Sequence, residues 1–462
     1  MKRIYKITQV ALFGALVVGC TDLDTAPLSS TITADQKEDV VAADPSKIEA
    51  SVTAITANFT QYAKIYTEDD NVHSDIGYPT IMLATDSRTT DFVADITGYN
   101  WYSNSADYSD CLSTSTATIE FWGTLYNQIY TANAVIGTVD NETSDPTLQF
   151  YLAQALAIRA FDYFTLVQLY QFNYKGHEDA PGVPIITPEN AEEAAANGCA
   201  RSTVKETYEF ILGDLNKAIE LLANTKKTRS DKRYVSLDVA YGIRARVHLT
   251  MHNYADALKD AEAALASTSS VPYSSAAVSK PTFIDIEDAS WMWGILITDK
   301  DRVSTTGICN FPSHMGSLNY GYASVGGWRR ISPKLYNQIP ESDVRKGWFL
   351  DDTGVSVNLP AAAQAYITKK GAPVYTQVKY GPMNDEWGSN NNATDVILMR
   401  VEEMYLIKAE AQAMNNDVSG GVNTLNSFVN NCVRHMKEIG DGNLDAKLER
   451  MDKKEFNQIT DG

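Results

Sequence analysis

Hydrophobic residues recur every three or four positions in several stretches of the chain, the spacing that lines one face of an α-helix. In the stretch 126–139, for example, Tyr126, Ile129 and Tyr130 follow this spacing. Other stretches have helical spacing or an Ala-rich, helix-favouring composition: 148–172, 202–222, 237–251, 254–265, 397–414 and 418–436. The pattern therefore predicts a mostly α-helical protein.

Two of the predicted helices follow each other closely. Helices 237–251 and 254–265 are separated by only two residues, and Ala257 and Ala261 present small side chains along the second helix. Tetratricopeptide repeats use this arrangement, because antiparallel helices approach closely where small side chains face each other. We therefore expect helix pairs over about 122–172, 202–268 and 397–437.

Residues 270–396 have a different composition from the helical stretches on either side. Trp, Tyr, Gly, Ser, Pro and Asn dominate, and long helical periods are absent. A stretch of this length is too long for a simple connection, so we expect loops and short strands that the helices carry. Within it, Trp291-Met292-Trp293 lies in a strand-like run and is expected to pack in the core.

The first residues of the chain have the layout of a secretory signal. Three basic residues, Lys2, Arg3 and Lys6, precede an apolar run that ends at Gly19-Cys20. The run is shorter than the ~20 residues that span a bilayer. Its end resembles the lipobox of bacterial lipoproteins, in which the cysteine is acylated after cleavage; the alternative is an ordinary signal peptide with an incidental cysteine.

We therefore expect a signal peptide over 1–19 and a lipid anchor on Cys20. Residues 20–45 have no sustained period and are expected to form an extended tether, followed by a single domain over 46–462. The net charge of −19 becomes more negative after cleavage, which argues against nucleic acid and anionic lipid as partners of the folded surface.

The other cysteines give no sign of a framework. They are Cys111, Cys199, Cys309 and Cys432. They lie far apart without Cys-x-x-Cys spacing, which excludes a zinc ribbon and a redox motif. A chain of this length can bury a large core without cross-links, so we predict no disulfide framework.

Several motifs, in this order along the chain, are similar to those of one known family. They are Cys20-Thr-Asp-Leu-Asp24, Trp122–Ile136, Ala153–Tyr170 before Gly182-Val-Pro-Ile185, Arg244-Ala-Arg246, Val344-Arg345 and Met399–Leu406. Together they resemble the RagB/SusD family of outer-membrane lipoproteins from Bacteroidetes. The resemblance implies a SusD-like fold, in which a tetratricopeptide-like superhelix of helix pairs carries an irregular, loop-rich half with short strands.

The resemblance also implies a function. Family members are non-enzymatic, lipid-anchored lids that sit on a TonB-dependent, SusC-type barrel at the cell surface and capture glycan or, in some members, peptide. One departure concerns the C-terminus: the family usually continues into an Arg- and Glu-rich helix, whereas this chain stops at Thr460-Asp461-Gly462. We therefore expect the C-terminal family segment to be missing.

A glycan site needs flat aromatic rings for the sugar faces and polar groups for the hydroxyls. Loop stretches rich in both supply the candidates Trp101, Tyr102, Asn104, Tyr320, Tyr322, Trp328, Arg329 and Trp387. In the family, an aromatic residue near the position of Trp328 commonly lines the ligand pocket. The alternative is that these rings fill the core of the loop-rich half.

Other chemistry has weaker support. Acidic pairs such as Asp351-Asp352 and Asp385-Glu386 would suit a secreted glycosidase, but a chain with 58 acidic residues contains such pairs by chance. His248 and His252 lie four residues apart without a third zinc ligand. The stretch 69–75 lacks the Gly and Glu of an EF-hand, which leaves only a looser structural calcium site open. We expect no catalytic residue, no metal site and no cofactor; a scaffolding protein is the remaining alternative.

Overall fold

The computed structural model describes residues 34–62, 72–305 and 307–433. The chain divides into two compact units, Met1–Lys47 and Ile48–Gly462. The described part of the first unit contains the helix α2 (Ala34–Ala43). This helix lies inside the expected extended tether, so that expectation is wrong for these residues. Their sequence, ADQKEDVVAA, holds strong helix formers and neither Gly nor Pro, which explains the helix.

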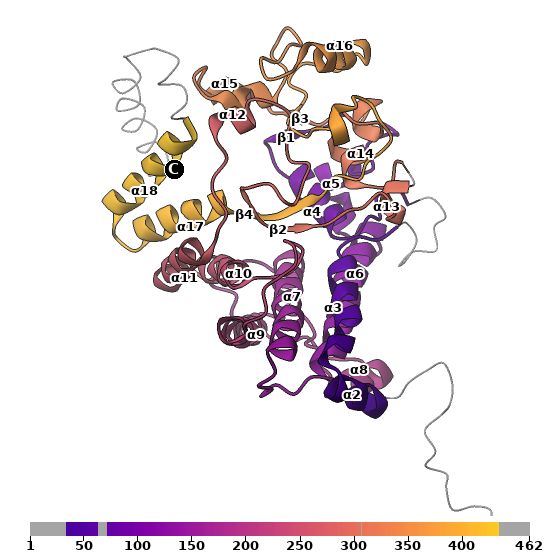
Figure 1. Cartoon of the computed structure of the whole chain (residues 1–462). Helices are drawn as coiled ribbons and strands as arrows, with labels where there is room; N and C mark the ends of the chain where they lie inside the picture. Colours follow the sequence, from indigo (N-terminus) through magenta and orange to yellow (C-terminus); the bar gives the residue numbers. More distant parts are fainter. Residues whose placement is uncertain (1–33, 63–71, 306, 434–462) are drawn as a thin grey trace, which may run out of the picture. The chain divides into compact units, whose positions relative to one another are not determined.

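A succession of helices forms the main support of the second unit (Figure 1). They are α3 (Glu49–Ala57), α6 (Thr116–Ile136), α7 (Pro146–Tyr170), α9 (Val204–Asn224), α10 (Leu237–Thr250), α11 (Tyr254–Ser267), α17 (Val401–Met414) and α18 (Val418–Val433). Each packs on the next one in this order. We call this succession the helical frame; it confirms the predicted mostly helical, tetratricopeptide-like fold.

Side chains at the first turns fix where the helices begin. Asp145 accepts hydrogen bonds from the backbone N–H groups of Thr147 and Leu148, at 2.8 and 2.9 Å, and so caps α7. Thr203 caps α9 in a capping box with Glu206, whose side chain accepts from the Thr203 backbone N–H. The helix therefore begins at Val204, two residues after the start of the predicted stretch 202–222.

Two arginines of the helical frame are paired with acidic residues on neighbouring helices. The Arg159 guanidinium on α7 donates to both carboxylate oxygens of Asp214 on α9 at 2.7 Å, and to Asn133 on α6 at 2.7 Å. Arg246 on α10 binds Glu403 on α17 in the same two-pronged manner, at 2.6 and 2.5 Å. These pairs satisfy groups that burial would otherwise destabilise, and they tie the successive helices together.

The loop-rich region contains short antiparallel strands. β1 (Phe92–Val93) pairs with β3 (Arg330–Ile331), and β2 (Trp291–Ile295) with β4 (Val396–Arg400). The predicted helix from 397 is therefore wrong for its first four residues. The run VILMR is rich in β-branched and apolar side chains, and it pairs with β2 before α17 begins at Val401.

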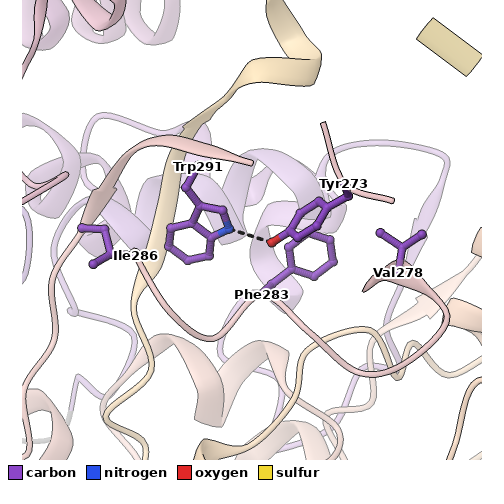
Figure 2. Packing of buried hydrophobic residues seen from close by; sticks show 5 residues of the cluster. All are labelled: Tyr273, Val278, Phe283, Ile286 and Trp291. Carbon is purple, nitrogen blue, oxygen red and sulfur yellow. Dashed lines mark hydrogen bonds between the residues drawn. The ribbon is translucent and has the colours of Figure 1, made fainter. Parts of the chain in front are cut away.

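The predicted core role of the tryptophan-rich strand is confirmed. Trp291, Met292 and Trp293 of β2 are fully buried. Figure 2 shows the neighbouring core, in which the Trp291 indole N–H donates to the hydroxyl oxygen of Tyr273 at 2.9 Å beside the Phe283 ring. The polar end of each large ring thus has a partner where it leaves water.

Short helices complete the described fold. They are α4 (Tyr78–Ser87), α5 (Ser103–Ala106), α8 (Ala191–Asn197), α12 (Ser275–Val278), α13 (Arg302–Thr305), α14 (Phe311–Met315), α15 (Pro333–Gln338) and α16 (Ala361–Lys369), with 3-10 turns η1 (Pro45–Ile48), η2 (Ser109–Cys111), η3 (Tyr322–Ser324), η4 (Val344–Trp348) and η5 (Met383–Asp385). Among the described helices, none is both long and apolar enough to cross a bilayer. Cys111, Cys199 and Cys309 carry free thiols.

Candidate functional site

Two of the loop stretches predicted to bind a ligand meet in the structure. The Tyr322 ring, at the start of η3, lies with its centroid 6.4 Å from that of Tyr99 and 6.0 Å from that of Trp101. His73, from the segment before α4, adds a ring 5.0 Å from Trp101. We call His73, Tyr99, Trp101 and Tyr322 the aromatic cluster. Their sequence separation shows that folding, and not local sequence, assembles it.

Glycines allow the two loops to approach this closely. A Cβ atom on Gly326 would lie 2.8 Å from Cδ2 of Tyr99, and one on Gly321 would lie 2.2 Å from Oγ of Ser313. Both glycines also have a positive φ, 147° and 150°. Any other residue would strain the backbone. At Gly326 its side chain would press on Tyr99, and at Gly321 on Ser313 of α14, so these glycines position the rings of Tyr99 and Tyr322.

Two histidines hold the Tyr322 ring in place. Its hydroxyl is hydrogen-bonded to Nδ1 of His73. The fully buried His314 stacks on the ring at 5.0 Å, and its Nε2–H donates to the carbonyl oxygen of His73 at 2.9 Å. Burial lowers the pKa of His314 to about 3, so the ring is neutral near pH 7. The Tyr322 orientation is thus fixed in advance of any ligand.

Aromatic surface remains open to solvent at this position. Tyr99 is 50% exposed and Tyr320, two residues before Tyr322, is 44% exposed, while Trp101 and Tyr322 are partly buried. Exposed aromatic rings that neighbouring side chains hold firmly are suited to stack on apolar faces of a ligand, because little conformational freedom is lost on binding.

A cleft of about 400 Å³ adjoins the aromatic cluster. Three predicted residues, Trp101, Tyr102 and Asn104, line it together with Val72, Ser74, Thr80, Ala84, Ser105, Ser109, Asp110, Leu112, Thr114, Ser115, Thr116, Ala117, Glu120 and Phe121. The volume lies in the usual range for small-molecule sites. An aromatic wall beside many hydroxyl, amide and carboxyl groups matches the two-sided chemistry of a sugar.

The carboxyl groups of the cleft differ in their surroundings. Asp110 accepts from Nη2 of Arg88 at 3.0 Å and from the Ser105 hydroxyl at 2.6 Å. Glu120 on α6 is only 2% exposed, and its Oε1 has no hydrogen-bond partner among the described residues. Burial, helped by the Asp75 carboxylate, raises the pKa of Glu120 to about 8. Glu120 is therefore a neutral acid near pH 7.

Three residues at the site, His73, Asp110 and Glu120, were not among the site residues predicted from the sequence. Glu120 lies inside a helix where a lone acidic residue is usually on the solvent face, and only the fold shows that it is buried beside the cleft. His73 is separated from Tyr322 by about half the chain, so no local pattern connects them. The single available signal was that both Asp110 and Glu120 follow the aromatic stretch 99–104 closely.

Two predicted ligand residues lie in the interior. Trp328 is 7% exposed and packs with Leu318, Leu350, Ile367 and Val378, so its ring faces the core. Arg329 is fully buried; it donates to the carbonyl oxygen of His314 at 2.8 Å and to Oδ1 of Asn100 at 2.7 Å. The structure corrects the expectation for both side chains, because neither offers a surface to a ligand. Arg329 instead links Asn100 in one loop to His314 through its two hydrogen bonds.

Trp387 lies apart from the aromatic cluster. It packs against the core around Trp328 and lines a separate cleft of about 610 Å³, whose polar members include Asp285, Asp288 and Asn384. Tyr102 is buried, and its hydroxyl donates to the carbonyl oxygen of Ser74 at 3.3 Å. Of the predicted residues, Trp101, Tyr102 and Asn104 line the first cleft, and Tyr322 lies beside it against Trp101. Tyr320, two residues before Tyr322, is not part of the cleft lining.

The sites weighed for metals have other surroundings. His248 lies with Nε2 3.8 Å from the Asp260 carboxylate, inside the contact between α10 and α11. The calcium expectation over 69–75 falls in part, at 69–71, on residues outside the described ranges. Within 34–62, 72–305 and 307–433, no three His, Cys, Asp or Glu side chains gather to hold a metal ion.

Comparison with known families and structures gives consistent matches. Residues 35–249 match the SusD-like family model described as starch-binding associating with outer membrane. No curated protein matches the chain. Solved structures match it over most of its length, which shows that the fold is SusD-like beyond the range of the family model.

Three examples, all from Bacteroides, illustrate the likeness. A SusD-like carbohydrate binding protein from Bacteroides vulgatus is 24% identical with a TM-score of 0.67, covering 84% of this chain and 75% of that one. A SusD superfamily protein from Bacteroides thetaiotaomicron is 20% identical with a TM-score of 0.65, covering 84% and 80%. Surface glycan-binding protein A from Bacteroides thetaiotaomicron, in complex with laminarihexaose, is 18% identical with a TM-score of 0.55, covering 84% and 83%.

Proposed function

Because the chain is a RagB/SusD-family protein, we propose that it is a cell-surface lipoprotein that captures an oligosaccharide and passes it to a TonB-dependent, SusC-type barrel. The observation that carries this proposal is the aromatic cluster beside the polar cleft. The carbohydrate binding named for the similar structures supports the same ligand class.

The chemistry of the cleft fits this ligand. A sugar ring offers an apolar face of C–H groups and a rim of hydroxyl groups. The ring faces of Tyr99 and Trp101 would stack on the first, and side chains such as Asn104 would bond the second. Because Tyr322 is held by His73 and His314, binding requires little reordering.

Capture for import needs no bond breaking and only modest affinity. The glycosidase alternative predicts released products, whereas a capture protein returns its polysaccharide intact. Incubating the protein with a polysaccharide panel and analysing reducing ends separates the two. We expect no increase in reducing ends; a steady release of product would contradict the proposal.

The proposed membrane attachment depends on Cys20, which lies outside the described residues. Acyl chains contribute about 0.8 kcal/mol per buried methylene, so several chains hold a protein on a membrane without a spanning helix. Cys20→Ser should therefore move the protein from the membrane pellet to the soluble fraction. Cys111→Ser, which changes an exposed free thiol, is the matched control and should leave it in the pellet.

The most direct test of the ligand class is affinity electrophoresis of the chain without residues 1–20. Gels would contain starch, laminarin, inulin, xylan, mannan or host glycans, with a peptide mixture tested separately. Retardation by one polymer supports oligosaccharide capture and names the class. A folded protein that binds only the peptide mixture would contradict it and favour the peptide-capturing alternative.

A further inference from the structure

We propose that Glu120 is a ligand-binding residue of the cleft, and that it acts as a neutral carboxylic acid that donates a hydrogen bond to an uncharged hydroxyl or carbonyl group. This inference rests on the proposed binding function of the same cleft. It adds a property of the ligand: the group that reaches Glu120 carries no charge.

The first observation that supports this role is the position of Glu120. The residue lies near the start of α6, is 2% exposed, and lines the cleft together with Trp101 and Asn104. Its Oε1 has no hydrogen-bond partner in the described part of the chain. Buried polar atoms nearly always have partners, and one left open beside a cleft is suited to a ligand group.

The second observation that supports this role is the charge around Glu120. The Asp75 carboxylate, fully buried and bonded to Gln61, disfavours a second negative charge beside it. Burial acts in the same direction, and together they raise the pKa of Glu120 to about 8. A protonated carboxyl group can donate one hydrogen bond and accept another, which matches a sugar hydroxyl.

The nearby cations are engaged elsewhere. Arg88, from the end of α4, is paired with Asp110 at 3.0 Å. Arg329 donates to His314 and Asn100. Burial raises the pKa of Tyr102 further above its usual value, so the phenol keeps its proton. Burial lowers the pKa of His73, so the imidazole beside Trp101 is uncharged above pH 7. No Lys, Arg or His side chain of the described residues forms an ion pair with Glu120.

The alternative occupant would be a cationic group, such as the ammonium of an amino sugar. It would bind Glu120 in its ionised form, so affinity would rise with pH. A neutral acid predicts the opposite, because the donated hydrogen bond disappears when the proton is lost. The two ligands are therefore distinguished by the sign of the pH dependence.

The experiment measures affinity for the polymer that most retards the wild-type chain, between pH 6 and pH 9. We expect Glu120→Gln, which keeps a donor and an acceptor, to stay within about threefold of wild type near pH 7. Glu120→Ala should lose about tenfold, the equivalent of one hydrogen bond. Above pH 8, wild-type affinity should fall while that of Glu120→Gln stays level.

Asp162→Asn is the matched control. Asp162 is also a fully buried acid without a hydrogen-bond partner among the described residues, but it lies within α7 and does not line the cleft. Its substitution should leave affinity and its pH dependence unchanged. Thermal unfolding of each variant confirms that the protein used is folded.

The outcomes separate the inference from the proposed function. If wild type is retarded and Glu120→Ala binds equally well, or if affinity rises with pH, the role of Glu120 is contradicted while glycan capture stands. If a folded wild-type protein is retarded by no polymer, glycan capture is contradicted, and the binding role of Glu120 with it.

Discussion

Buried polar groups are satisfied differently in the interior of the helical frame and in the cleft beside the aromatic cluster. Inside the frame, Arg159 meets Asp214 and Asn133 at 2.7 Å, so its charge is matched. At the cleft, Glu120 is as well buried but has an oxygen without a partner in the described residues. The frame uses its polar groups to hold helices together, whereas the cleft keeps one for another molecule.

Breaking the matched pair should produce the largest change. Arg159→Ala leaves the Asp214 carboxylate buried without its partner, which typically costs 3–5 kcal/mol, so we expect a loss of about 4 kcal/mol in the free energy of unfolding. Urea unfolding followed by circular dichroism measures it. Lys205→Ala, which removes an exposed pair with Glu209, should change stability by less than about 0.5 kcal/mol. If Arg159→Ala and Lys205→Ala lowered stability equally, the buried pair of Arg159 with Asp214 would contribute no more than an exposed pair.

The effect of Glu120→Gln on the free energy of unfolding tests the raised pKa of the Glu120 carboxyl group. The folded-state pKa of Glu120 is raised from 4.5 to about 8, so the folded protein holds a proton that the unfolded chain has lost in this range. Wild-type stability from this group is fully present below pH 4.5 and is lost as pH rises through 8. We expect Glu120→Gln to match wild type at pH 4 and to be more stable by about 4 kcal/mol at pH 8. If the stabilities of wild type and Glu120→Gln changed in parallel with pH, the raised pKa of Glu120 would be contradicted.

Asp162 is an exception inside the helical frame and sharpens the comparison. Burial raises the pKa of this carboxyl well above its usual range, and both oxygens lack partners among the described residues. Because it faces no cleft, removing its charge should only stabilise. We expect Asp162→Asn to raise the free energy of unfolding by about 1–2 kcal/mol at pH 7, measured by urea unfolding. A loss of glycan binding in this variant would mean that a substitution inside α7 alters the cleft.

The smallest expected effect concerns the exposed edge of the aromatic cluster. Tyr99 is 50% exposed, so Tyr99→Ala should lower affinity for the retarding polymer by about fivefold with little change in stability, because a stacking ring contributes about 1 kcal/mol. Tyr130→Ala, on a 71% exposed ring of α6, is the control and should bind like wild type. Equal retardation of both variants would place Tyr99 outside the site.

Much of the helical frame could be predicted from the sequence. The long helices after residue 115 were found because an amphipathic period of three to four residues depends only on neighbouring positions. The same local signal could not detect β4 at the start of the 397–414 stretch, because its partner β2 lies about a hundred residues earlier. Nor did it reveal α2, whose ten residues have no regular apolar face.

The candidate site could be predicted only in part. The enrichment of aromatic residues marked the loops at 99–104 and 319–329, and Trp101 and Tyr322 do lie together. Composition does not determine which ring of a loop faces outward, which is why Trp328 was expected at the surface and lies in the core. Glu120 was missed because its burial depends on the loop that packs beside α6.

The central claim is that the aromatic cluster, and not the core ring of Trp328, holds the ligand. It is tested most directly by affinity electrophoresis of Trp101→Ala in the gel that retards wild type. The matched control is Trp122→Ala, a 36% exposed indole on α6 that packs on Tyr126 and Tyr170 away from the cleft. We predict that Trp101→Ala migrates freely while Trp122→Ala is retarded like wild type. Full retardation of a folded Trp101→Ala would contradict the claim.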